Sequence, residues 1–259
     1  MSALTAIRAT LKAAVTIAFF LMSSAGENVA HAVEIKVLSG NGGRAAVTEL
    51  CSQFERATGH KVIIRFEVNA ELKRKIEAGE TFDVAILNPL VLDDLIKQGK
   101  IVSGTRVDIG WAGLGVAVRA GAPKPDVSSV EAFKRTLLNA KSIAFPWEGA
   151  SGIYFANLLV RLGIAEDMKP KLKPMPAEDT VEVVARGEAD IVVVIASRIV
   201  DVPGVEAAGL LPSELQTSIG IAAGVSSNAS EPAAAKVLTQ FFTSPAAALI
   251  IKAKGLNPP

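Results

Sequence analysis

Apolar runs alternate with amphipathic stretches along most of the chain, which is typical of an α/β protein. In the first half, three short β-branched runs are each followed by a stretch with apolar residues three or four positions apart. Strands are predicted at 34–38, 61–66 and 82–87, and helices at 44–58, 70–78 and 90–98. This order indicates parallel strands, because a helix must carry the chain back to the start of the next strand.

The second half repeats this pattern after a linker rich in Gly and Pro at 119–126. A capping box of Ser128 and Glu131 predicts a helix start. Strands are predicted at 113–118, 141–145, 190–196 and 218–225, with a helix from 153 to 162 and two alanine-rich helices at the end. We expect strand 218–225 to return to the first lobe.

Two similar stretches suggest that the chain forms two similar lobes. "IEAGETFDVAIL" (76–87) and "VARGEADIVVV" (184–194) both run from a helix end through Gly and Glu to an Asp before a buried strand. A glycine C-cap and an Asp at a strand entrance are common turn chemistry, but the two copies lie far apart in the chain. We expect lobe I to comprise residues 33–112 and 216–259, and lobe II residues 113–215.

The first 32 residues have the pattern of a secretory signal peptide. Arg8 and Lys12 form a basic segment, Ala13–Met22 is an apolar core, and Ala30–Ala32 fits a small-residue cleavage site. The apolar run is too short for a membrane anchor. We therefore expect residues 1–32 to be removed and the protein to reside in the periplasm.

Composition excludes several partners. The formal net charge is +1 and only 5% of residues are aromatic, which argues against nucleic acid and against a polybasic membrane surface. The single cysteine, Cys51, lies at an apolar position of the helix predicted at 44–58, which favours a buried thiol and a fold without disulfides.

Few residues suit catalysis. His60 is the one histidine after residue 32, and no nucleophile motif, phosphate loop or metal-ligand spacing appears. The sequence therefore predicts a protein that is not an enzyme and that holds no cofactor and no metal. The alternative left open is a secreted α/β enzyme that uses carboxylates such as Glu148, Glu178 or Asp179.

Neutral hydrogen-bond donors gather where helices are predicted to begin. The turn "SGNGG" places Asn41, Gly42 and Gly43 between a strand and a helix, where backbone N–H groups lack partners. Asn69, Ser151 and Thr180 occupy comparable positions. Several such dipoles can stabilise a dehydrated anion without a full counter-charge, so the sequence predicts an anion site between the lobes.

Four collinear stretches carry a family resemblance across nearly the whole chain after residue 32. They are "IKVLSGNGGRAAVTELCSQFERATGHKV", "ELKRKIEAGETFDVAIL", "GASGIYFANLLVRLGIAEDMKPKL" and "PAEDTVEVVARGEADIVVV". The chain resembles the periplasmic solute-binding proteins of ABC importers, specifically the molybdate-binding type within the two-lobed type II class of these binding proteins. The resemblance implies two α/β lobes, each a mixed, mostly parallel sheet flanked by helices, with molybdate or tungstate bound in the cleft between them.

The resemblance also implies which positions bind the ligand. The family's two serines fall on Gly42 and Asn69, its loop donors on Ser151 and Thr180, and its tyrosine on Ile195. Three hydroxyl donors are therefore missing, and a hydrogen bond to a charged group is worth about 1.5–3 kcal/mol.

Arginine can compensate for the missing hydroxyls. Arg44 follows the first turn and Arg198 follows the strand that carries Ile195, and a guanidinium fork suits a carboxylate well. Asn88 is a further candidate lining residue. Trp147 and Tyr154 flank the third loop, where an apolar wall and core packing are both open interpretations.

The leading hypothesis is a monomeric solute-binding protein that captures a small anion and delivers it to the membrane permease of an ABC importer. Two alternatives share the fold: a site for a small organic carboxylate, and an exported sensor domain. Closure is expected about hinge strands near 108–113 and 215–218, with ligand that contacts both lobes favouring the closed state.

Overall fold

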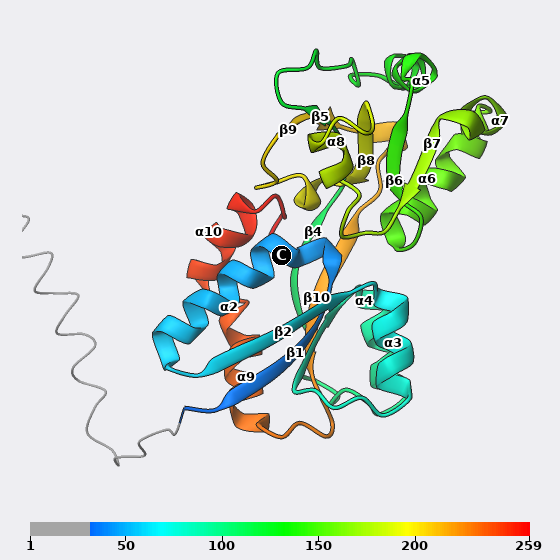
Figure 1. Ribbon diagram of the computed structural model, residues 1–259. Helices are drawn as coiled ribbons and strands as arrows, with labels where there is room; N and C mark the ends of the chain where they lie inside the picture. The colour runs from blue at the N-terminus through cyan, green and yellow to red at the C-terminus, as the bar shows by residue number, and fades with distance from the viewer. Residues whose placement is uncertain (1–31) are drawn as a thin grey trace, which may run out of the picture. The chain divides into compact units, whose positions relative to one another are not determined.

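Two five-stranded sheets organise residues 32–259, the part of the chain that the computed structural model describes (Figure 1). The predicted signal peptide, residues 1–32, lies outside the described residues except for Ala32. The first sheet has the order β2-β1-β3-β10-β4 and the second β7-β6-β8-β5-β9. The strands are β1 (Glu34–Gly40), β2 (Lys61–Glu67), β3 (Val84–Leu87), β4 (Val107–Ala112), β5 (Leu114–Arg119), β6 (Ile143–Pro146), β7 (Leu172–Met175), β8 (Ile191–Ile195), β9 (Val205–Leu210) and β10 (Ile219–Val225).

The two sheets share one pairing pattern. In the first, β1 pairs in parallel with β2 and β3, and β10 pairs antiparallel with β3 and β4. In the second, β6 pairs in parallel with β7 and β8, and β5 pairs antiparallel with β8 and β9. We call each sheet with its packed helices a lobe. The predicted lobe boundaries at 112/113 and 215/216 stay a prediction.

Helices cover both faces of the first sheet, as Figure 1 shows. α2 (Arg44–Thr58), α9 (Pro232–Phe241) and α10 (Pro245–Ala253) pack on one face, and α3 (Asn69–Glu77) and α4 (Pro89–Lys97) on the other. Alternate strand residues serve the two faces: Val37 and Ile86 face the first group, whereas Leu38 and Leu87 face the second. This arrangement confirms the predicted α/β fold class.

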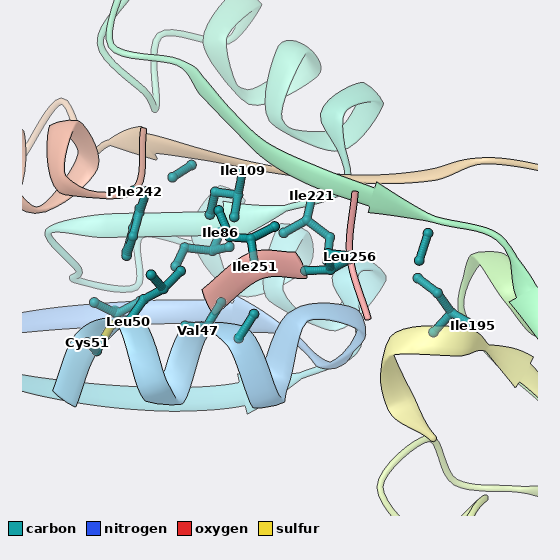
Figure 2. Packing of buried hydrophobic residues seen from close by; sticks show 14 of the residues in the cluster. Val47, Leu50, Cys51, Ile86, Ile109, Ile195, Ile221, Phe242, Ile251 and Leu256 are labelled. Atoms are coloured by element: carbon teal, nitrogen blue, oxygen red, sulfur yellow. The ribbon is translucent and has the colours of Figure 1, made fainter. Parts of the chain in front are cut away.

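Cys51 lies in the core between α2 and the first sheet (Figure 2). Its neighbours include Leu50 from the same helix and Phe242, which follows α9. Burial raises the pKa of the Cys51 thiol to about 12, so the thiol is inert at neutral pH. The predicted buried thiol is confirmed.

The second sheet is covered in the same way. α5 (Val130–Asn139), α6 (Ala150–Arg161) and α7 (Ala165–Met168) pack on one face, and α8 (Glu182–Ala185) on the other. The remaining helices are short 3-10 turns: η1 (Asn41–Gly43), η2 (Lys169–Lys171), η3 (Ala196–Arg198) and η4 (Ser213–Leu215). The sequence pattern does not predict β7 or β9, because both strands are largely exposed and lack a buried apolar run.

The two repeated Asp residues perform the same task in the two sheets. The Asp83 carboxylate accepts a hydrogen bond of 2.8 Å from the Lys36 N–H in β1, and the Asp190 carboxylate accepts one of 2.8 Å from the Lys141 N–H before β6. Each Asp thus ties the start of one strand to its parallel neighbour. β3 and β8, which follow the two Asp residues, occupy the same place in their sheets.

One predicted helix cap is wrong by one residue. Ser129, not Ser128, caps α5, since its hydroxyl oxygen accepts a hydrogen bond of 3.2 Å from the Ala132 N–H. The Ser128 hydroxyl instead donates to the Asp126 carboxylate at 2.6 Å. Because the Ser128 hydroxyl is bonded to Asp126, Ser129 is the serine that caps α5.

The two connections between the sheets lie side by side. The Gln216 side chain accepts from the Leu114 N–H at 2.7 Å and donates to the Leu114 carbonyl at 3.0 Å. Tyr154 donates its hydroxyl to the Leu215 carbonyl at 2.9 Å. Within residues 32–259 no single helix could cross a membrane by length and apolar content, although α9 and α10, bent by 65°, pass that test as a pair.

Candidate functional site

A pocket opens at the carboxyl ends of β1, β2, β6 and β8, where both sheets contribute loops. Ligands of open α/β sheets bind at this end of the strands. The pocket has a volume of about 60 Å³, which limits its ligand to a small molecule. It is lined by Asn41, Gly42, Val68, Asn69, Pro146, Glu148, Gly149, Ala150, Ser151, Ala177, Val194, Ile195, Arg198 and Ile219.

A larger hollow of about 800 Å³ lies on the second lobe, beside α5 and the linker before it. It opens near the amino ends of β6 and β8, since Lys141 and Ile191 line it. None of the predicted site residues lines it. Position at the strand ends therefore favours the smaller pocket.

The first lobe contributes two asparagines and a glycine to the pocket. Asn41 and Gly42 come from η1, directly after β1, and Asn69 begins α3 after β2. A Cβ added to Gly42 would lie 3.6 Å from the Cδ1 atom of Ile195, so the glycine faces the second lobe at close range. Gly42 and Ile195 therefore meet across the pocket.

Gly43 and Asn88 do not line the pocket. A Cβ on Gly43 would lie 3.0 Å from Ile221, so this glycine permits close packing beneath the turn. The Asn88 side chain accepts a hydrogen bond of 3.1 Å from the Leu90 N–H and caps α4. Local structure accounts for both residues.

The N-terminus of α6 forms the wall from the second lobe. Gly149 has φ +88° and ψ 168°, a conformation that is essentially restricted to glycine. A Cβ on Gly152 would lie 1.6 Å from the Pro146 carbonyl oxygen. These glycines let the first turn of α6 pack directly on the end of β6.

This helix start leaves donors for a ligand. The first intrahelical bond runs from the Ile153 N–H to the Gly149 carbonyl at 3.1 Å, so the preceding N–H groups have no partner within the helix. Ala150 and Ser151 line the pocket at this point. An anion placed here is stabilised by those N–H groups and by the helix dipole.

Arg198 is a buried cation in the pocket wall. Its residue is 8% exposed, and one terminal nitrogen donates to the carbonyls of Ala177 and Glu178 at 3.3 Å each. The same nitrogen lies 3.5 Å from a Glu182 carboxylate oxygen. The Arg198 Nε is buried and has no hydrogen-bond partner among the described residues. A buried donor without a partner is costly, and the positive charge of this guanidinium in the pocket wall favours an anionic ligand.

Arg44 lies next to Asn41, a residue of the pocket lining. Its guanidinium donates to the Asn41 Oδ1 at 2.6 Å and lies 4.2 Å from the centre of the Phe66 ring. Burial, and then the charge of Arg198, lower the pKa of Arg44 from its usual value. Arg44 itself does not line the pocket.

Thr180, Trp147 and Tyr154 also lie outside the pocket lining. Thr180 is fully buried and donates its hydroxyl to the Pro176 carbonyl at 2.7 Å. Trp147 is 58% exposed. Tyr154 holds the connection between the sheets, as described above.

Glu148 lines the pocket although the anion-site prediction omits it. Burial raises the pKa of this carboxyl, and the charges of Glu178 and Glu71 raise it further. Asp179, by contrast, forms an ion pair with Arg186 at 2.8 Å and does not line the pocket. Glu148 stands directly before Gly149, the residue that precedes α6, and this position is the sequence signal that could have indicated it.

In the described part of the chain, no group of three or more His, Cys, Asp or Glu residues is arranged to hold a metal ion.

Comparison with known proteins gives consistent matches along the chain. A family model for bacterial extracellular solute-binding proteins matches residues 35–257. An aconitate isomerase from Pseudomonas sp. is 34% identical over 230 residues, which are 86% of this chain and 87% of that protein. The molybdate-binding protein ModA of Escherichia coli is 27% identical over 240 residues, or 90% of this chain and 92% of that protein.

A solved structure shows the same fold. The periplasmic molybdate-binding protein of Azotobacter vinelandii has a TM-score of 0.74 at 22% identity, covering 87% of this chain and 99% of that one. These matches confirm the predicted resemblance to molybdate-type periplasmic binding proteins. They also support solute binding for an ABC importer and a periplasmic location.

The prediction that the chain is not an enzyme is wrong. The relative with 34% identity is named as an enzyme. The prediction relied on missing nucleophiles and histidines, but a proton transfer needs only one positioned carboxylate with a suitable pKa. Glu148 is a carboxylate in the pocket lining whose pKa is raised by burial.

Proposed function

Because the chain belongs to the bacterial extracellular solute-binding protein family, we propose that its pocket binds aconitate, a small tricarboxylate, and interconverts its isomers. The observation that carries this proposal is the presence of Glu148 and Arg198 in one pocket. One is a carboxylate with a raised pKa and the other a buried guanidinium with an unpartnered nitrogen. Together they supply a base and an anion anchor.

The reaction requires only the movement of a proton. Aconitate has a methylene carbon beside a carbon–carbon double bond, and each of these three carbons carries a carboxylate. Glu148 removes a methylene proton, the C–H electron pair forms a new double bond, and the old double bond opens toward the far carbon. Glu148 returns the proton to that carbon. The product is again aconitate, whose new double bond takes either geometry, so no oxidant or water is consumed.

The electrostatics of the pocket suit both steps. A general base works best when its pKa lies near the operating pH, and the raised pKa of Glu148 moves it in that direction. Arg198, the first turn of α6 and the asparagines of the first lobe offer donors to the three carboxylates. The same donors stabilise the charge that develops when the proton leaves.

A second candidate is capture of molybdate for an ABC importer. Two observations favour it: the 27% identity to ModA across most of both chains, and a pocket of about 60 Å³. In this case the loaded protein presents the oxyanion to a membrane permease. The two candidates predict different ligands and only the first predicts turnover.

The test measures binding and turnover together. Isothermal titration with cis-aconitate, trans-aconitate and molybdate identifies the ligand, and proton NMR of each aconitate isomer follows interconversion. We expect binding of aconitate and interconversion of its isomers. Binding of molybdate without turnover of aconitate supports the second candidate, and no heat with any of the three anions contradicts both.

A variant locates the base. Glu148→Gln keeps the size of the side chain but cannot accept the proton, so we expect turnover to fall at least about 100-fold while aconitate still binds. Glu166→Gln is the control, because Glu166 is exposed and pairs only with Lys169 among the described residues. Equal loss in both variants, or none in Glu148→Gln, rules out Glu148 as the base.

A further inference from the structure

The two asparagines of the pocket are both held by their carboxamide oxygens. The Asn41 Oδ1 accepts from the Arg44 guanidinium at 2.6 Å, and the Asn69 Oδ1 accepts from the Asn88 backbone N–H at 3.0 Å. Both asparagines line the pocket, from η1 and from the start of α3. Asn41 is 7% exposed, so its side chain is part of a built wall.

These contacts determine that the oxygen of each carboxamide, and not its nitrogen, points toward the donor group of the protein. A guanidinium and a backbone N–H can only donate, so neither can accept from a carboxamide NH₂ group. The usual ambiguity between the oxygen and nitrogen of an asparagine is therefore removed at both sites. Within residues 32–259, neither Nδ2 group has a hydrogen-bond partner, and both belong to residues that line the pocket.

We infer that Arg44 and the Asn88 N–H are positioning groups that turn the two asparagines into donors for an anionic ligand. Arg44 then acts through Asn41 and does not contact the ligand. This inference rests on the proposed binding of a small anion in the pocket, and it names the chemistry that selects that anion. A ligand that presents only acceptors, such as an ionised carboxylate or an oxyanion, satisfies both Nδ2 groups.

The surroundings hold both positioning contacts in place. The Arg44 guanidinium lies on the Phe66 ring at 4.2 Å, which limits its alternative orientations. A Cβ on Gly40 would lie 2.9 Å from the Asn69 Oδ1, so a glycine is needed for Asn69 to reach the Asn88 N–H. Burial lowers the pKa of Arg44, with a further contribution from Arg198, and bound negative charge would favour the charged form of Arg44.

The test replaces each donor by an acceptor of the same shape. In Asn41→Asp and Asn69→Asp the Nδ2 group is replaced by a carboxylate oxygen, while the contact with the positioning group remains. We expect each substitution to weaken binding of trans-aconitate, or of molybdate if that is the anion bound, at least about 100-fold in isothermal titration. The control is Asn157→Asp on the exposed side of α6, which adds the same charge and is expected to change affinity less than about twofold.

Arg44 requires a double-mutant cycle. Arg44→Met keeps an extended side chain over Phe66 but releases Asn41, so we expect about tenfold weaker binding, with Arg44→Lys recovering most of it. In an Asn41→Ala background the Arg44→Met effect is expected to fall to less than about twofold, because the donor that Arg44 positions is already gone and no new charge is introduced. Equal effects in both backgrounds contradict the positioning role. Thermal melts followed by circular dichroism verify that every variant is folded.

The outcomes separate this inference from the proposed function. Wild-type protein that binds neither probe overturns both. If wild-type protein binds a probe and the two Asp variants bind it equally well, the inference alone is wrong. If molybdate binds without turnover of aconitate and the Asp variants lose it, the donor arrangement stands and the isomerase proposal fails.

Discussion

At the scale of single residues, Glu148 links the chemistry of the pocket to the stability of the fold. Burial and the charges of Glu178 and Glu71 raise its pKa above the value in the unfolded chain. A carboxyl group with a raised folded-state pKa contributes stability below its unfolded pKa and loses it as the pH rises through the folded pKa. The ionised side chain therefore destabilises the protein at neutral pH.

We accordingly expect Glu148→Gln to increase the free energy of unfolding at pH 7 by up to about 0.5 kcal/mol. The gain should disappear near pH 3, below the ordinary glutamate pKa of about 4.3, where the carboxyl is protonated in both states. Urea unfolding at the two pH values measures the difference, with Glu166→Gln as the control. A variant less stable than the wild type at pH 7 contradicts the assigned direction of the pKa.

Arg198 is the second residue whose geometry makes a prediction. One of its terminal nitrogens is anchored to two backbone carbonyls, while its Nε has no partner in the part of the chain that the structure describes. Lysine keeps the positive charge but has no N–H donor at the position of the arginine Nε. Arg198→Lys should therefore weaken binding of trans-aconitate about tenfold or more in isothermal titration. Arg161→Lys, on the exposed end of α6, is the matched control. Equal affinities would show that only charge matters at Arg198.

At the scale of elements, the two Asp residues at strand entrances allow a quantitative comparison. The buried Asp83 carboxylate accepts from the backbone N–H groups of Lys36, Ser230 and Glu231. Among residues 32–259, the exposed Asp190 carboxylate accepts from the Lys141 N–H alone. Asp83 thus joins β1, β3 and the segment before α9. Its removal leaves three backbone donors without their acceptor.

We expect Asp83→Ala to lower the free energy of unfolding by about 3–5 kcal/mol and Asp190→Ala by about 1 kcal/mol. Urea denaturation of the two variants measures the difference. Asp83→Asn provides the isosteric comparison, since it keeps one acceptor but loses the charge. Similar losses for the two Ala variants would mean that the shared sequence pattern, not burial, sets the contribution.

The same elements show what sequence patterns can and cannot predict. The repeated Gly-Glu-Asp pattern predicted two equivalent strand entrances because it encodes local turn chemistry. The cap of α5 could not be assigned between Ser128 and Ser129, because the choice depends on Asp126. β7 and β9 have no apolar alternation because their sides are exposed, so only their pairing with β6 and β5 identifies them.

For the site, the order of strands predicted which loops meet, since loops at the carboxyl ends converge. Asn41, Gly42, Asn69, Ser151 and Ile195 line the pocket. The direction of each side chain depends on tertiary partners that the pattern does not contain. The Arg44 guanidinium contacts Phe66 and Asn41 and is not part of the pocket lining. The Thr180 hydroxyl donates to the Pro176 carbonyl, and Thr180 is likewise not part of the lining.

At the scale of the whole molecule, η3 and the residues directly after it combine part of the pocket lining with contacts between the two lobes. Arg198 lines the pocket, the neighbouring Ser197 hydroxyl donates to the Gly42 carbonyl of the first lobe at 2.6 Å, and Asp201 forms an ion pair with Lys254 after α10. Asp201 is the non-glycine residue with positive φ in the described part of the chain. The segment 196–201 therefore carries both a residue of the pocket lining and two contacts between the lobes.

This arrangement predicts that ligand binding and lobe closure are coupled through Ser197. Removing a neutral hydrogen bond costs about 1 kcal/mol, so Ser197→Ala should weaken aconitate binding about fivefold by depopulating the closed state. Small-angle scattering of the ligand-free variant should show a larger radius of gyration than the wild type, and saturating trans-aconitate should restore compaction. Ser213→Ala is the control, since the Ser213 hydroxyl donates to the adjacent Glu214 carboxylate and Ser213 does not line the pocket. If Ser197→Ala matches that control in both affinity and scattering, the contact at η3 does not govern closure, and the coupling must reside in the segments that Gln216 joins.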